Sequence, residues 1–198
     1  MKVLIFVDLH GDMEELSRIK DKAKDKDIEL IICAGDLTLF EKKLDLILFE
    51  LNKIDKPILI IHGNHETEND VENICSLFDH TIFLHKKTHE VGHHMFIGYG
   101  GGGFDIEDSE FRSHAKKIKK KIKKNHKVVL ITHAPPHGTK VDYLRKEHKG
   151  NKDIRLFIED VQPVLVVCGH FHENAGTEDM IGRTRIINPG QRGKIVDV

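Results

Sequence analysis

The chain has 198 residues, of which 31 are basic and 32 acidic, so no strong net charge favours nucleic acid or a membrane surface. The first apolar run meets Asp8 too early for a signal peptide, and no run approaches the length of a membrane span. The three cysteines show no metal-site spacing, which excludes a cysteine-rich metal site. We therefore expect one domain over residues 1–198, large enough to bury a core, in the reducing cytoplasm.

Short apolar runs alternate with amphipathic stretches over the first eighty residues. The runs, each typical of a buried strand, cover residues 2–8, 29–35 and 58–61. Asp12 followed by Glu15 resembles a helix cap. Apolar residues at helical spacing predict helices around Leu16–Ala23, Leu44–Leu51 and Val71–Phe78. This β-α-β-α order predicts right-handed crossovers and a largely parallel sheet.

The pattern changes after residue 80. Strand-like runs at 81–84, 88–91 and 94–99, with a turn at Gly92-His93, predict an antiparallel meander. The remainder predicts helices over 107–125 and 152–160, strands over 128–132 and 164–168, and short strands within 174–198. The fold class that accommodates both halves is α/β (α+β), with two mixed β-sheets packed face to face and helices outside, as a four-layer sandwich.

Five apolar runs end in side chains that commonly bind metals. These side chains are Asp8, His10, Asp36, Asn64, His133, His170 and His172. Open sheets place functional groups beyond the carboxyl ends of their strands, and in extended chain an i, i+2 pair points to one side. Any one of these residues is more often a turn former, so the hypothesis rests on their convergence. Carboxylate, imidazole and amide ligands suit Mn, Fe, Co, Ni or Zn, and seven ligands suit two ions bridged by Asp36.

The same motifs resemble those of the calcineurin-like metallophosphoesterases. In chain order the motifs are Asp8-Leu9-His10, Gly35-Asp36, Gly63-Asn64-His65-Glu66, Thr132-His133 and Gly169-His170-Phe171-His172. The resemblance implies a sandwich of two mixed sheets and two divalent ions, with manganese the first expectation and Fe, Ni, Co or Zn as alternatives. It implies that Asp8, His10, Asp36 and His172 hold one ion. It implies that Asp36, Asn64, His133 and His170 hold the other.

The resemblance also implies a mechanism. A hydroxide activated by two metal ions would attack a phosphodiester, and His65, which is not a ligand, would protonate the leaving oxygen or bind the phosphoryl group. One departure concerns the substrate phosphate, because many relatives carry an arginine soon after Gly-Asp and this chain has only Lys42 nearby. We expect a small phosphoester substrate, such as a nucleotide. A nuclease, a phosphomonoesterase and a non-catalytic scaffold, like the retromer subunit that shares this fold, are the alternatives.

Three further features stay secondary. The glycine run Gly98–Gly103 matches a dinucleotide pattern only trivially, and we interpret it as a flexible loop near the active site. The lysines of Lys116–Lys124 are interpreted as the solvated face of a helix, in preference to a nucleic-acid surface. His137 and Asp142 would either face the substrate or shape their loop, and the sequence favours neither.

Overall fold

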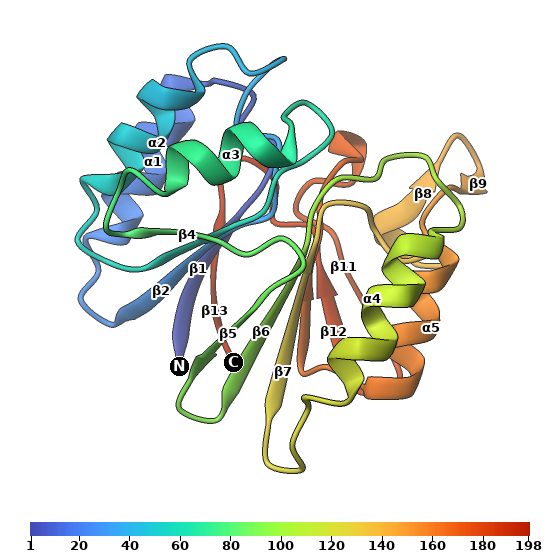
Figure 1. The fold of residues 1–198 in the computed structure, drawn as a ribbon. Coiled ribbons are helices and arrows are strands. Elements are labelled where there is room, and N and C mark those ends of the chain that lie inside the picture. Colours follow the sequence, from blue (N-terminus) through green and yellow to red (C-terminus); the bar gives the residue numbers. More distant parts are fainter.

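The computed structural model covers residues 1–198, and its strands form two large sheets (Figure 1). The first sheet has the strand order β13-β1-β2-β3-β4, and the second has the order β11-β12-β10-β7-β6-β5. The strands of the first sheet are β1 (Lys2–Phe6), β2 (Ile28–Cys33), β3 (Ile58–Ile60), β4 (Thr81–Phe83) and β13 (Lys194–Asp197). Those of the second are β5 (Thr88–Val91), β6 (His94–Tyr99), β7 (Lys127–Thr132), β10 (Leu165–Val167), β11 (Glu178–Ile181) and β12 (Thr184–Ile187).

Both sheets are mixed, as predicted. Strands β1 to β4 are parallel, and β13 joins β1 in the antiparallel sense at the edge. In the second sheet β6, β7, β10 and β12 are parallel, while β5 and β11 are antiparallel edge strands. A separate small hairpin joins β8 (Tyr143–Leu144) to β9 (Glu147–His148). The parallel strands of each sheet therefore end at the same edge, where the motif residues follow them.

Helices cover the outer face of each sheet and complete four layers (Figure 1). The first sheet packs against α1 (Met13–Ala23), α2 (Leu44–Asn52) and α3 (Glu68–Cys75), and the second against α4 (Ser109–Lys119) and α5 (Lys152–Val161). Asp12 caps α1 as predicted, with its carboxylate accepting hydrogen bonds from the backbone N–H groups of Glu14 and Glu15 at 2.9 and 3.0 Å. No helix has both the length and the apolar character needed to cross a bilayer.

The unbroken apolar runs follow from burial on both faces of each sheet. In β1, Leu4 and Phe6 pack toward the helices, whereas Val3 and Ile5 pack into a core shared with strands of the second sheet. In β7, too, alternate residues pack toward the helices and into the core between the sheets, because successive side chains of a strand point to opposite faces. The two sheets thus sandwich one core between them and hold their strand ends in fixed relation.

Two sequence expectations need correction. The antiparallel meander predicted over 81–99 is wrong in its first strand. The chain passes from β3 through α3 to β4, which therefore pairs with β3 in parallel, and only β5 and β6 form a hairpin. The helix expected over 107–125 ends at Lys119. Beyond that residue the run of lysines places like charges one turn apart, which disfavours helix.

Candidate metal centre

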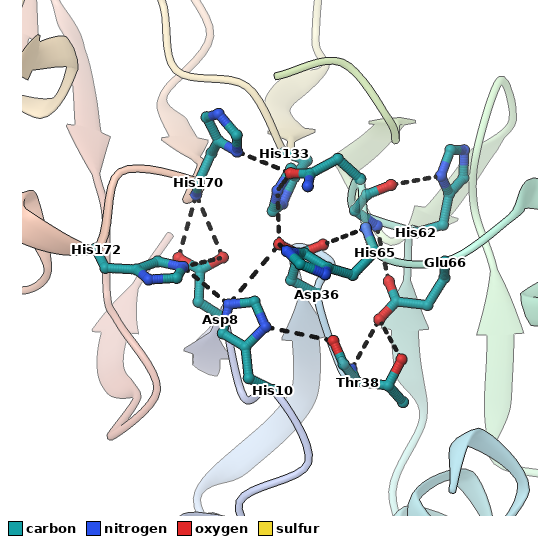
Figure 2. A network of polar contacts seen from close by, with 12 residues as sticks. Asp8, His10, Asp36, Thr38, His62, His65, Glu66, His133, His170 and His172 are labelled. Carbon is teal, nitrogen blue, oxygen red and sulfur yellow. Dashed lines mark hydrogen bonds and ion pairs between the residues drawn. The ribbon is translucent and has the colours of Figure 1, made fainter. Parts of the chain in front are cut away.

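The seven predicted ligands come together at the carboxyl ends of five strands. Asp8, Asp36 and Asn64 follow β1, β2 and β3 of the first sheet, and His133 and His170 follow β7 and β10 of the second. Figure 2 shows the carboxylates and imidazoles pointing toward one another. Backbone hydrogen bonds connect the loops, since Asp8 N–H donates to the Gly35 carbonyl at 3.1 Å and Gly169 N–H to the His133 carbonyl at 3.0 Å. Residues distant in the sequence therefore form one rigid rim.

One group of four side chains lies on the His172 side of this rim. It comprises Asp8, His10, Asp36 and His172, whose nearest donor atoms all lie within 4.8 Å of one another. The Nε2 atoms of His10 and His172 are 2.8 Å apart, and His10 Nε2 lies 3.8 Å from Asp36 Oδ2. His172 Nε2 lies 3.9 Å from Asp8 Oδ1. These are the residues that the family resemblance implied for the first ion.

A second group shares Asp36 with the first. His133 Nε2 lies 3.3 Å from Asp36 Oδ2 and 3.0 Å from Asn64 Oδ1. His170 Nδ1 lies 2.8 Å from the same Asn64 oxygen. The carboxylate of Asp36 is thus placed between two clusters of donor atoms, as a bridging ligand requires.

The spacing of these atoms fits two divalent ions. Ligand atoms bonded at about 2.1 Å to one ion lie about 3 Å apart at right angles and about 4 Å apart on opposite sides, and the separations within the two groups range from 2.8 to 3.9 Å. The donors are carboxylate, imidazole and amide, without thiolate. Burial lowers the pKa of His10, and burial together with the charge of His133 lowers the pKa of His170 to about 4, so both rings are neutral and keep a lone pair. The donor set therefore fits a dinuclear divalent metal site.

The central pair has strongly shifted pKa values. Burial alone would raise the pKa of Asp36, but its hydrogen bond and charge interaction with His133 lower it to about 2. Burial alone would lower the pKa of His133, but the Asp36 carboxylate raises it to about 9. Burial raises the pKa of Asp8. The buried Asp36 side chain is consequently an anion that requires a positive charge beside it.

The backbone around the ligands differs from the sequence expectation. Asp8, His10, Asp36 and His170 have φ angles of 57°, 48°, 50° and 70°, in the left-handed region, and not the extended chain expected of their i, i+2 spacing. His172 instead opens a short 3₁₀ helix, η2 (His172–Asn174). Asp, Asn and His tolerate the left-handed region better than other non-glycine residues, and such strain at about 1–3 kcal/mol per residue is typical of functional sites.

Glycines in the motifs allow the loops to approach closely. A Cβ atom on Gly63 would lie 1.9 Å from Oδ1 of Asp36, and one on Gly35 would lie 2.7 Å from the Gly63 nitrogen. Any side chain at Gly63 would therefore displace the Asp36 carboxylate from between the two groups.

His65 lies beside the two groups without belonging to either. Its backbone N–H donates to Asp36 Oδ1 at 3.0 Å, and its ring Nε2 lies 3.9 Å from Asp36 Oδ2. The ring also packs at 5.0 Å from the His10 ring and is partly exposed. It therefore faces both the centre and the solvent, which is the position of a group that transfers a proton to a bound molecule.

Glu66, the last residue of the Gly-Asn-His-Glu motif, is a buried connector (Figure 2). Its Oε1 accepts hydrogen bonds from Thr38 N–H and Thr38 Oγ1 at 2.7 and 2.9 Å, and its Oε2 accepts one from Gly63 N–H at 3.0 Å. It joins the loop after β2 to the loop after β3, which carries Asn64 and His65.

One cation beside the centre is not predicted by the sequence. A cavity of about 510 Å³ is lined by Asp8, His10 and His172 on one side and by residues 189–192 on the other. Arg192 contributes an exposed guanidinium to it, whereas Lys42, the candidate from sequence, does not line it. The only local signal was a turn at Asn188-Pro189-Gly190, which gave no reason to bring residue 192 to the site.

The structure also places the secondary features. Asp142 is buried and accepts hydrogen bonds from the N–H groups of Thr139 and Gly150 and from His148 Nδ1 at 2.7, 2.9 and 2.9 Å, so it shapes its loop. His137 Nδ1 lies 3.8 Å from the same carboxylate, in that loop. In α4 the lysines are exposed while Ala115 and Ile118 are buried, an arrangement that a solvated face and a nucleic-acid surface share.

A further cluster of potential ligands, His62, Glu68 and His85, lies beside the glycine run. His85 Nδ1 accepts a hydrogen bond from Gly100 N–H at 2.7 Å, so its proton is on Nε2, which lies 3.3 Å from Glu68 Oε2. Lys86 Nζ also lies 3.4 Å from that Glu68 oxygen. Because Nε2–H of His85 and the ammonium group of Lys86 already lie near this carboxylate, the cluster fits a support for the glycine run better than a metal site.

The chain is similar to a known protein family and to solved structures of the same fold. A family model described as calcineurin-like phosphoesterase matches residues 1–174. An uncharacterized protein of Methanocaldococcus jannaschii is 29% identical over 210 residues, covering 99% of this chain and 91% of the relative. The crystal structure of TT1561 of Thermus thermophilus has a TM-score of 0.77 at 15% identity, covering 96% of this chain and 90% of that one. A novel archaeal phosphodiesterase has a TM-score of 0.55 at 16% identity, with 96% and 84% covered.

Proposed function

Because this chain belongs to the calcineurin-like phosphoesterase family, we propose that it is a dinuclear-metal phosphodiesterase. Membership of the family makes it a metal-dependent hydrolase of phosphoester bonds. The two donor groups that share Asp36 support the dinuclear centre, and the finer proposal, that the bond is a phosphodiester, rests on the space around that centre. The archaeal phosphodiesterase of the same fold agrees with it.

Each of the two donor groups would hold one metal ion. Asp8, His10, Asp36 and His172 would hold one divalent ion, and Asp36, Asn64, His133 and His170 the other. When bound, the ions would lower the pKa of a water and offset the charge of the phosphoryl oxygens. Manganese remains the first expectation for their identity.

His65 is the proposed general acid. Its ring lies at the rim, close to Asp36 but outside both donor groups. A phosphoester placed at the centre would present its leaving oxygen to this ring, and His65 would donate the proton that the departing alkoxide needs. The hydrogen bond from His65 N–H to Asp36 and the bond from Gly63 N–H to Glu66 fix the loop that carries the ring.

The surroundings of the centre favour a diester. The cavity bearing Arg192 opens beside His10 and His172, and the partly exposed rings of His65 and His170 leave the centre open at two further places. A phosphate with two organic groups would thus have space on two sides. Arg192 would supply the cation that is absent after Gly-Asp, with its guanidinium held by no closer partner than Glu15 at 3.8 Å.

The alternatives are weaker on specific grounds. A phosphomonoesterase would use the same centre but would leave one of the two sides empty. A nuclease would need a basic footprint around the centre, and Arg192 alone does not provide one. A non-catalytic scaffold would not require all seven donors and His65 to converge. The substrate would then be a small phosphodiester such as a nucleotide derivative, hydrolysed in the cytoplasm.

Hydrolysis of bis(p-nitrophenyl) phosphate and of p-nitrophenyl phosphate, each with Mn, Ni, Co and Zn, tests the proposal. We expect metal-dependent turnover of both esters, with a higher kcat/KM for the diester, because both of its aryl groups find space. A preference for the monoester would contradict the diesterase proposal. No turnover with any ion would favour the scaffold.

A further inference from the structure

Two phenylalanines stand exposed beside the centre, one from each sheet. Phe40 is 74% exposed and its ring centroid lies 4.7 Å from that of His65. Phe104 is 63% exposed and lies 4.8 Å from the His170 ring. Leaving a phenylalanine in water forgoes about 1.5–3 kcal/mol of burial free energy, so exposed aromatic rings adjoining a site are typical of ligand contacts.

The loop that carries Phe40 is firmly attached to the loop that carries His65. Thr38 binds the buried Glu66 carboxylate, and Glu41 N–H donates to Thr38 Oγ1 at 3.1 Å. The Glu41 carboxylate in turn accepts from Thr67 N–H at 3.0 Å. Phe40 itself has a φ of 52°, a left-handed conformation that a bulky residue rarely adopts without such anchoring. The position of its ring relative to His65 is therefore built into the fold.

Phe104 is positioned from the other side by the glycine run. Gly100 N–H donates to His85 Nδ1 at 2.7 Å, and Gly101 N–H donates to the His62 carbonyl at 3.0 Å. A Cβ atom on Gly103 would lie 3.5 Å from Cε1 of His170, so the run passes directly beside the centre. The Phe104 ring also lies 5.5 Å from the ring of the buried Phe171.

We propose that Phe40 and Phe104 form an aromatic subsite that selects phosphodiesters with planar, aromatic organic groups, such as aryl or nucleobase-bearing groups. The inference rests on the proposed function. The group on the leaving oxygen must lie beside the proton donor His65, and the side chain it meets there is Phe40. The remaining organic group lies toward His170, where Phe104 presents its ring. Stacking on an aromatic side chain contributes about 1–3 kcal/mol per base or ring.

Two diesters with the same leaving group separate the roles of the rings. Bis(p-nitrophenyl) phosphate and methyl p-nitrophenyl phosphate both release p-nitrophenol but differ in the group that stays on phosphorus. Phe40→Ala should raise KM about tenfold for both, whereas Phe104→Ala should raise it about tenfold only for the bis-aryl diester. Phe40→Tyr and Phe104→Tyr should restore KM, because planarity is what the subsite uses.

A matched control is Phe49→Ala, which removes an exposed phenylalanine from α2, where the ring lies 6.2 Å from Phe78 and away from the centre. This variant should leave both KM values unchanged. Metal content measured on every variant should equal that of the unmodified protein. Phe40→Ala and Phe104→Ala proteins that keep normal KM values for both diesters would overturn the inference while leaving the proposed function intact.

A binding measurement tests the subsite without turnover. We expect phenyl phosphate to bind the metal-loaded protein about tenfold more tightly than inorganic phosphate in calorimetric titration, and Phe40→Ala to abolish the difference. Equal affinities of the two ligands would overturn the inference. Absence of hydrolysis combined with tighter binding of phenyl phosphate would reject the proposed function and retain the aromatic subsite.

Discussion

Asp36 Oδ2 lies 3.3 Å from His133 Nε2, in a pair whose side chains are 1% and 0% exposed. The carboxylate comes from the first sheet and the imidazole from the second, so the pair joins the two halves of the sandwich at the centre of the site. Its opposite pKa shifts, to about 2 and about 9, show how strongly Asp36 demands a neighbouring positive charge. A divalent ion held by both residues would take over that role from the imidazole proton, because an imidazole ligand is neutral.

Replacing the shared carboxylate should disable both metal positions. For Asp36→Asn we expect fewer than one bound ion per chain in place of two, and a loss of at least about 10³-fold in kcat/KM, because the bridging charge is gone. Elemental analysis and the diesterase assay measure both. Asp45→Asn, an exposed carboxylate on α2, is the control and should change neither. A fully metallated, active Asp36→Asn protein would contradict the bridging role.

Removing the proposed general acid should spare the metals. His65→Gln should retain both ions and lose about 10²–10⁴-fold in kcat. The loss should grow as the leaving group becomes more basic, from p-nitrophenyl to phenyl esters, because a poorer leaving group depends more on protonation. A purely structural role predicts an equal loss for all esters, and an unaltered rate would exclude any role in turnover.

The guanidinium of Arg192 should bind the substrate phosphate. Arg192→Ala should raise the inhibition constant of inorganic phosphate about tenfold, because a charge-assisted hydrogen bond is worth about 1.5–3 kcal/mol. Arg192→Lys should recover part of the affinity, since it keeps the charge and loses the forked geometry. Lys42→Ala, which changes the cation nearest in sequence to Gly-Asp, is the comparison and should have little effect. The reverse ranking would assign the phosphate to Lys42.

Acid should unfold the protein partly through His85. Burial lowers its pKa to about 3 in the folded chain, against 6.5 for an unfolded histidine. The unfolded state therefore binds the proton first, and stability is complete above pH 6.5 and is lost as pH falls toward 3. From pH 6.5 to 5 the loss is about 1.6 kcal/mol.

Urea unfolding at both pH values, with EDTA present, measures this contribution. His85→Gln keeps an acceptor for Gly100 N–H and should show a smaller acid loss than the unmodified protein. His93→Gln, at the exposed β5–β6 turn, should behave as the unmodified protein. Identical pH dependence in His85→Gln and the unmodified protein would show that protonation of His85 does not drive the transition.

Local sequence was enough to predict much of the architecture. Runs such as Leu30–Cys33 are apolar throughout because both faces of their sheets are covered, and that composition alone predicts buried parallel strands. It was not enough for Thr81–Phe83. That segment has the length and composition of a hairpin strand, and only its pairing partner β3 distinguishes a parallel crossover from a meander.

The chain by itself determined the chemical identity of the centre. Carboxylates, imidazoles and an amide follow five apolar runs, and parallel strands necessarily bring their ends to one edge. Only the tertiary structure decided how those side chains are aimed, through left-handed turns at residues such as Asp8 and His170, and what surrounds them. Arg192, Phe40 and Phe104 reach the rim through contacts between segments far apart in the sequence, and no local pattern of residues encodes such contacts.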